Sequence, residues 1–197
     1  DGVKKKRKEA KGYLNVVIFE PTDVDLFTQQ PEARRKYLNM VLSQKSFEYL
    51  DNITRYKKVL TQKNRLLQDI RAGRAGQDAF GTLQSWNEQL VEIGSQIILE
   101  RKTFINFLNQ NISEVYAGIS QFQRTIEVIY ETIPGDTLEE IQAEFSSALE
   151  RLAKRESQAG TSLIGPHRDD FDLKSEGLYL VSFSSRGEQR SQVLALK

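Results

Sequence analysis

Two long stretches in which apolar residues recur every three or four positions limit the folds open to this chain. The first begins after Ser46, and the second runs from about Asp78 to Gly118. Such spacing keeps one apolar seam of a helix turned toward a partner helix. The seam of the first stretch consists of Tyr49, Ile53, Tyr56, Leu60, Leu67 and Ile70, with Lys63 in a seam position. The seam of the second consists of Leu83, Trp86, Leu90, Ile93, Ile97 and Phe104, with Glu100 as a charged exception, and then of Leu108, Ile112, Val115 and Ile119.

The two predicted helices are too long for a compact globule of this size. At 1.5 Å per residue they would extend roughly 40 and 60 Å. Residues 71–76, which contain two glycines three positions apart, separate them as a turn or a flexible tip would. A shorter helix is expected to begin at Pro31. We therefore predict an antiparallel helical arm with its tip at the Arg-Ala-Gly repeat, and the alternative is that the seams pack within a shorter bundle.

Strand-like segments lie on both sides of these helices. Residues 14–19 form a β-branched apolar run that predicts a buried strand, and 125–133 have the composition of a strand. Thr137 and Glu140 form a capping box for a helix that should end near Gly160. Three further short strands are predicted at 161–164, 171–174 and 179–183.

The order of these elements predicts an α+β fold in which a long helical excursion leaves a sheet and returns to it. We expect residues 1–30 and 120–197 to form one part, with a small and mainly antiparallel sheet. Residues 31–119 are expected to form the helical arm inserted into that part.

The last stretch of the chain, from Ser184 to Arg190, is a candidate anion site. Strand-like residues precede it and helix-like residues follow, so Ser185 and Gly187 should lie at a strand-to-helix turn. The start of a helix presents free N–H groups and a favourable dipole, and a glycine lets phosphate oxygens approach the backbone. The alternative is an ordinary helix cap in which Ser185 only closes the first turn.

Three blocks of the sequence carry a resemblance to a known family. Residues 185–190, Ser-Arg-Gly-Glu-Gln-Arg, resemble the ATP-binding-cassette signature in the form found in RecF proteins. Residues 165–171, Gly-Pro-His-Arg-Asp-Asp-Phe, resemble a block that RecF proteins carry shortly before that signature. The third block is similar to the RecF segment that leads into the helical lobe, and it comprises Asn15 to Phe19, Pro21, Asp23 and the pattern from Pro31 to Leu38.

The resemblance implies a central part of a DNA recombination and repair ATPase related to the chromosome-maintenance proteins. In that family two heads enclose ATP and Mg²⁺, and the signature turn of one head contacts the γ-phosphate held by the other. By position, the γ-phosphate contacts would be Ser185 and Gly187, with Arg186 and Gln189 beside them. The implied partners are DNA at single-strand/duplex junctions, a second copy in an ATP-dependent homodimer, and RecO/RecR-type mediators.

Other polar residues have weaker assignments. The basic residues Lys5, Lys6 and Arg7 are either DNA or head contacts or a solvated edge. Arg168, in the cluster at 167–170, is a possible DNA-facing or head-stabilising residue; without a nucleophile beside His167, hydrogen bonding within a Gly-Pro turn is preferred to catalysis. Glu20 stands at about the position where the chromosome-maintenance relatives have a glutamine that helps to hold the metal ion. We favour the interpretation that Glu20 is simply an acidic residue of a turn.

Composition excludes several classes of site and leaves others open. The 197 residues have a formal net charge of +1, so global charge does not favour a nucleic-acid partner and a basic surface must be local. With no cysteine and one histidine, disulfides are excluded and a zinc site is not expected. No apolar run is long enough to cross a bilayer and no signal peptide is evident, so we expect a cytoplasmic protein.

Two other functions fit the same sequence. One is a non-catalytic helical protein-interaction module in which the Ser-x-Gly turn is only a cap. The other is the head of a different chromosome-maintenance-type ATPase with a shortened coiled coil.

The chain alone is predicted not to hydrolyse ATP. It contains no phosphate-binding loop of the form Gly-x-x-x-x-Gly-Lys-Ser/Thr, and the apolar strand ending in Asp-Glu is expected after Lys197. A malachite-green assay should therefore detect no phosphate release above background. Turnover that persists when Gly187 is mutated would contradict this prediction.

Overall fold

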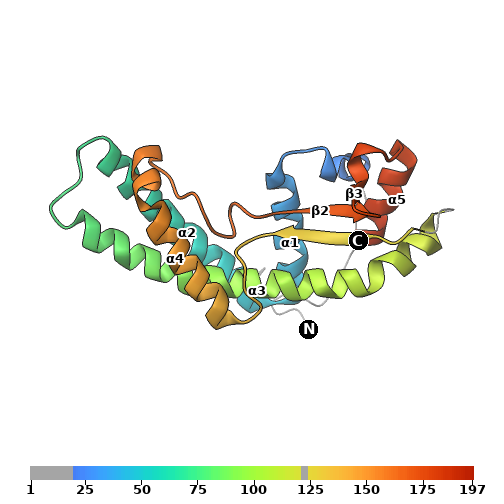
Figure 1. Cartoon of the computed structure of the whole chain (residues 1–197), viewed down its shortest axis with the longest axis horizontal. Coiled ribbons are helices and arrows are strands. Elements are labelled where there is room, and N and C mark those ends of the chain that lie inside the picture. Colours follow the sequence, from blue (N-terminus) through green and yellow to red (C-terminus); the bar gives the residue numbers. More distant parts are fainter. Residues whose placement is uncertain (1–19, 121–123) are drawn as a thin grey trace, which may run out of the picture.

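The computed structural model describes residues 20–120 and 124–197. Its helices and strands follow one another along an elongated molecule (Figure 1). They are the 3₁₀ helix η1 (Pro21–Phe27), α1 (Pro31–Lys45), α2 (Phe47–Arg71), α3 (Ala79–Ile119), β1 (Glu127–Glu131), α4 (Leu138–Ala159), β2 (Asp170–Ser175), β3 (Leu178–Tyr179), the 3₁₀ helix η2 (Leu180–Ser182) and α5 (Arg186–Leu196).

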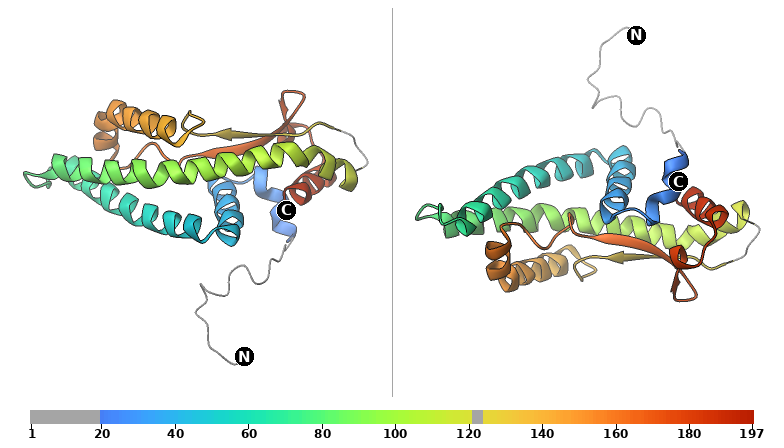
Figure 2. Two further views of the ribbon diagram at one scale, coloured as in Figure 1. Left: turned by 90° about the horizontal axis from the view of Figure 1, so that it is seen from below. Right: turned by 90° about the horizontal axis from the view of Figure 1, so that it is seen from above.

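The two long helices form the predicted antiparallel arm. The chain enters α2 through Ser46, whose Oγ accepts a hydrogen bond from the Tyr49 amide at 3.0 Å, and it turns back into α3 at the tip. Figure 2 shows α3 as a central rod, with α1 and α2 on one side of it and α4 and the sheet on the other. Helix α4, which lies in the 120–197 region, packs against both α2 and α3. The division into a head of 1–30 and 120–197 and an arm of 31–119 stays a prediction.

A three-stranded antiparallel sheet in the order β1-β2-β3 lies beside the second half of α3. Strand β1 pairs with β2 from Glu127 opposite Lys174 to Glu131 opposite Asp170. The outer edge of β1 is covered by α3, because the Asn109 side chain bonds both the amide and the carbonyl of Val128. The predicted α+β fold is therefore confirmed.

Two of the predicted strands are wrong. Residues 161–164 are irregular because side chains take their amides: Ser162 N donates to Asn64 Oδ1 at 2.7 Å and Leu163 N to Glu156 Oε1 at 2.8 Å. The strand predicted at 179–183 ends at Tyr179, since the amides that follow bond locally to the Leu180 carbonyl. The strand predicted at 14–19 lies outside the described residues.

The seam of α3 also departs from its prediction beyond Phe104. Val115 and Ile119 are each 44% exposed. The buried side there carries Ile105, Leu108, Ile112 and Tyr116, because this half of α3 faces the sheet instead of α2. The capping box at Thr137 and Glu140 is confirmed, and α4 ends at Gly160 in the left-handed conformation, with φ 71°.

A buried charged pair joins the helical arm to α4. Lys63 of α2 is 0% exposed, and its Nζ lies 2.7 Å from Oε2 of Glu156 on α4, which is 1% exposed. Lys63 Nζ also donates to Ser162 Oγ at 3.2 Å, and Ser162 Oγ donates to Glu156 Oε1 at 2.9 Å. Burial lowers the pKa of Lys63, and the Glu156 carboxylate opposes that shift. Helix α4 is thereby joined to α2 by a fully satisfied ionic cluster. None of the described helices is long and apolar enough to span a membrane.

Removing either charge of this pair should destabilise the fold far more than removing an exposed one. Lys63→Met and Glu156→Gln are each expected to cost about 3 kcal/mol, because each leaves the other charge buried and unpaired. The double variant should lose clearly less than the sum of the two single losses. Urea unfolding of all four proteins measures this coupling.

The exposed pair between Arg74 and Asp69 at the arm tip is the matched control. Asp69→Asn should cost less than about 1 kcal/mol. Strictly additive losses for the buried pair would contradict the assignment.

Candidate nucleotide-contact turn and its supporting network

The Ser185 turn is exposed and caps helix α5. Ser185 Oγ accepts from the Glu188 amide at 3.3 Å, and the Glu188 carboxylate accepts from the Ser185 amide at 2.8 Å. These bonds lower the pKa of Glu188, whose carboxylate also pairs with Arg124 at 3.2 Å. The cap anticipated as the alternative is present, and it leaves the turn on the surface of the protein.

The four predicted phosphate contacts lie together at this helix start. Arg186 is exposed and pairs with Asp25 of η1 at 3.0 Å. Gln189 is half-buried, and its Nε2 donates to the Ser184 carbonyl at 3.3 Å. Gly187 is exposed and has an ordinary φ; a Cβ placed on it would meet only Ser185 Oγ, at 4.0 Å.

The geometry of the turn fits a phosphate brought by another molecule. The amides of Arg186 and Gly187 have no hydrogen-bond partner within the described part of the chain, as is usual for the first turn of a helix. Both can donate to an anion, and the open space at Gly187 allows a close approach. The guanidinium of Arg186 is the cation beside them. These residues can bind and orient a γ-phosphate, and ATP would supply that phosphate when bound.

The 165–171 block lies at the centre of the molecule, where Arg101 and Asp169 form a buried ion pair. The two side chains are 1% and 5% exposed, and Arg101 Nη1 lies 3.3 Å from Asp169 Oδ2. Asp169 Oδ2 also accepts from the hydroxyl of Tyr130 on β1. The remaining donors of Arg101 reach Tyr49 Oη at 3.0 Å, Asn39 Oδ1 at 3.0 Å and the Pro166 carbonyl at 2.7 Å. One guanidinium on α3 therefore connects α1, α2, β1 and the block.

The neighbouring Asp170 ties the start of β2 to α1. Its carboxylate receives two parallel bonds from Arg34, Nε at 2.6 Å and Nη2 at 2.7 Å. Arg34 Nη1 in addition donates to three carbonyls around the end of η1, with a distance of 3.0 Å to that of Gln29. Arg35 Nη1 donates to the Asp169 carbonyl at 2.9 Å. These contacts orient η1 and β2, the two segments that flank the Ser185 turn.

His167 is structural, as the sequence favoured, and it bonds no carboxylate. Its Nδ1 lies 2.9 Å from Tyr56 Oη and its Nε2 lies 3.4 Å from the Ser162 carbonyl. Nε2–H donates to that carbonyl, so Nδ1 accepts from the tyrosine. Gly165, with φ 124°, is required here, because a Cβ would lie 2.4 Å from Tyr56 Oη.

The other candidate residues are dispersed. Arg168 is exposed, and its Nε and Nη2 donate to the Ser162 carbonyl at 3.2 and 2.9 Å. Glu20 starts η1, and its amide donates to Asp23 Oδ2 at 2.6 Å. No group of three or more His, Cys, Asp or Glu side chains able to hold a metal occurs within 20–120 and 124–197. Lys5, Lys6 and Arg7 lie outside the described residues.

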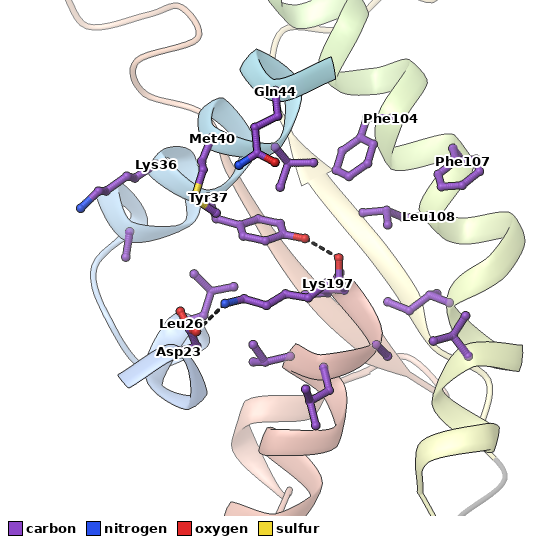
Figure 3. A pocket seen from close by; sticks show the side chains of 18 of the residues that line it. Asp23, Leu26, Lys36, Tyr37, Met40, Gln44, Phe104, Phe107, Leu108 and Lys197 are labelled. Atoms are coloured by element: carbon purple, nitrogen blue, oxygen red, sulfur yellow. Dashed lines mark hydrogen bonds and ion pairs between the residues drawn. The ribbon is translucent and has the colours of Figure 1, made fainter. Parts of the chain in front are cut away.

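A groove of about 820 Å³ lies between α1, α3 and the C-terminal end of α5 (Figure 3). Apolar side chains such as Met40, Phe107 and Leu108 line it. Two of its polar groups are paired: Lys197 Nζ with Asp23, and the Tyr37 hydroxyl with the Leu196 carbonyl. Burial raises the pKa of Tyr37, so this hydroxyl stays protonated. The Tyr37 hydroxyl is therefore not a candidate base.

Arg101, the residue on which the central network depends, was not among the residues predicted from the sequence. The signal was present but ambiguous, because Arg101 follows Glu100 and either charged residue could have faced the seam. Glu156 was missed for a similar reason, since a single glutamate among exposed charged residues of α4 does not reveal its partner.

His167 should titrate far below a normal histidine. Burial lowers its pKa to about 4, with Arg168 and Lys63 adding to the effect and the bond to the Ser162 carbonyl opposing it. In the unfolded chain the value is about 6.5, so between these pH values the unfolded state binds a proton that the folded state does not. Stability should therefore fall by up to about 3 kcal/mol as pH drops from 6.5 to 4.

Because this is the only histidine, NMR of its imidazole reports the pKa directly. His167→Gln should remove that part of the pH dependence, measured as the difference in unfolding free energy between the two proteins. An imidazole that titrates near pH 6.5 would contradict the buried, neutral histidine.

Comparison with known proteins identifies relatives along nearly the whole chain. RecF, a DNA replication and repair protein, of Agathobacter rectalis is 35% identical over 193 residues, which are 98% of this chain and 51% of that protein. RecF of Herpetosiphon aurantiacus is 38% identical over 188 residues, 94% of this chain and 47% of that protein. No family model matches the chain.

Two solved RecF structures also match this chain. The ATP-bound form of the recombination mediator RecF of the RecFOR pathway matches with a TM-score of 0.86 and 29% identity, over 96% of this chain and 50% of the other. A second RecF structure, that of the ATPrS form, matches with a TM-score of 0.88 and 28% identity, over 98% of this chain and 52% of the other. The chain spans about half the length of the curated relatives it matches. In sequence and in fold, as its three motif blocks predicted, this chain is similar to about half of a RecF protein.

Proposed function

We propose that this chain provides the signature face of a RecF-type DNA repair and recombination ATPase. In this proposal Ser185, Gly187, Arg186 and Gln189 contact the γ-phosphate of ATP held with Mg²⁺ by a second head. ATP thereby drives homodimerisation, and the dimer binds DNA at single-strand/duplex junctions and supports recombinase loading with RecO/RecR-type mediators. The cytoplasmic location predicted from the sequence belongs to the same proposal.

One observation carries the proposal: the Ser185 turn lies on the surface, at a helix start, in a chain whose fold matches ATP-bound RecF. A turn that acts on the ligand of another subunit must be accessible, and its donors must not be consumed internally. The amides of Arg186 and Gly187 meet both conditions. The cap formed by Ser185 and Glu188 is compatible with this role, because it fixes the orientation of the helix start and occupies the amides of Ser185 and Glu188, not those of Arg186 and Gly187.

Gly187 offers a variant that tests the turn without disturbing the fold. Gly187→Glu adds a negative side chain to the open space where phosphate would approach. An acidic residue in the first helical turn is favourable and a helical glycine is not, so thermal stability should be unchanged or slightly higher. In a protein completed to the length of its RecF relatives, ATP-dependent association measured by light scattering should weaken at least tenfold.

Ser146→Glu on the exposed side of α4 adds the same charge away from the turn and is the control. It should leave association unchanged, whereas Ser185→Arg should reduce it as Gly187→Glu does. If Gly187→Glu and Ser185→Arg both associate as the unmodified protein does, the turn is only a cap and the proposed role is wrong.

A further inference from the structure

The net charge of +1 conceals an uneven distribution of charge along the arm. Helix α2 contains six Lys or Arg residues and three Asp or Glu, whereas α3 contains two and four. Between Asp51 and Asp69 the sequence of α2 has no acidic residue at all. Since neighbouring helices of opposite charge cancel in the total, global charge could not reveal this surface.

Most of the positive charge of α2 points away from the core. We define the outer face of α2 as the exposed residues between Arg55 and Arg65 opposite its buried seam, and they are Arg55, Lys57, Lys58, Thr61, Gln62 and Arg65; the exposed acid Asp51 lies on the same side, one turn before Arg55. Lys63 is excluded, because it is buried against Glu156. Arg71 and Arg74 are excluded too, since Arg71 donates to the Ala159 carbonyl and Arg74 pairs with Asp69.

The four cations of this face have no ion-pair partner within residues 20–120 and 124–197. Other basic side chains near the core are paired, as Arg34 is with Asp170 and Arg101 with Asp169. A helix face that carries four unpaired cations against one exposed acid, Asp51, attracts a polyanion.

The spacing and polarity of the face favour a nucleic-acid backbone over an acidic protein. Arg55 and Arg65 are ten residues apart, about 15 Å along the helix, a length that corresponds to about four phosphates of one DNA strand. Gln62 adds a neutral amide of the kind that accompanies phosphate contacts, whereas the Thr61 hydroxyl donates to the Lys57 carbonyl at 2.8 Å. The large exposed hydrophobic side chain of α2 is Phe47 at its start, so the stretch from Arg55 to Arg65 lacks the apolar anchors typical of protein interfaces.

We infer that the outer face of α2 is the surface through which the arm binds the phosphate backbone of DNA. This inference rests on the proposed DNA-binding function and specifies where on the chain it occurs. The face lies on the arm, whereas the Ser185 turn lies beyond the sheet at the other end of the molecule (Figure 1). The two surfaces can therefore be altered independently.

The test neutralises three of the cations together, in the variant Arg55→Gln, Lys58→Gln, Arg65→Gln. Binding of this chain to a fluorescent duplex with a single-stranded tail is followed by anisotropy between 50 and 200 mM salt, with duplex alone and single strand alone as further probes. Three lost phosphate contacts should lower the slope of log K against log salt by about 3 and the affinity near 0.1 M salt by roughly 100-fold. Glutamine is a good helix former, so the melting temperature should be unchanged.

The control is Arg151→Gln, Lys154→Gln, Arg155→Gln on α4, which removes the same charge from exposed positions of another arm helix. It should change the affinity less than about threefold. Equal losses in both triple variants, or a normal affinity and salt slope in the α2 variant, would overturn the inference while leaving DNA binding itself intact. If the unmodified chain binds none of the three probes, the proposed DNA binding fails together with the inference. The Gly187→Glu experiment on association is independent of both.

Discussion

The buried ion pair between Arg101 and Asp169 is the interaction on which the rest of the structure depends. Burying a guanidinium and a carboxylate is costly unless their remaining donors and acceptors are satisfied. Here the tyrosines of α2 and β1, an asparagine of α1 and a backbone carbonyl satisfy them. Because each partner comes from a different element, the pair is stable only when the arm and the sheet are assembled together. An apolar cluster of the same size would tolerate small shifts between these elements, whereas this network does not.

That constraint extends from the centre of the molecule to its surface. Asp169 and Asp170 are consecutive, so the arginines that bind them position the first residues of β2. From there β2, β3 and η2 lead directly to Ser185. Arg34 also binds the carbonyls at the end of η1, and η1 in turn pairs with Arg186 through Asp25. The exposed turn is therefore supported from two sides by segments that converge on one polar centre.

The sequence predicted the parts of this fold that follow from regular spacing. The two long helices, the capping box at Thr137 and Glu140, the α+β class and the position of Ser185 at a helix start needed only periodicity and local hydrogen-bond rules. What it could not predict depends on pairs distant in sequence. Whether Lys63 would be buried depended on Glu156, 93 positions away in the chain. Residues 161–164 have strand-like composition, but Asn64 and Glu156 bind their amides first. In the same way, Val115 and Ile119 follow the seam spacing, yet α3 leaves α2 and turns a different side to the sheet.

The same distinction explains why charge was uninformative before the structure was known. A residue count treats Lys63, Arg101 and Arg65 alike, although the first two are neutralised inside the core and only the third faces solvent. Once the buried and paired side chains are set aside, the outer face of α2 retains four cations that have no ion-pair partner in the described chain. The long range of an electric field makes such a residue important to a polyanion even when its contribution to folding is small. Residues that hold the arm to the sheet and residues that attract a ligand can thus be of the same amino-acid type. What distinguishes them is whether the side chain is buried or exposed to solvent.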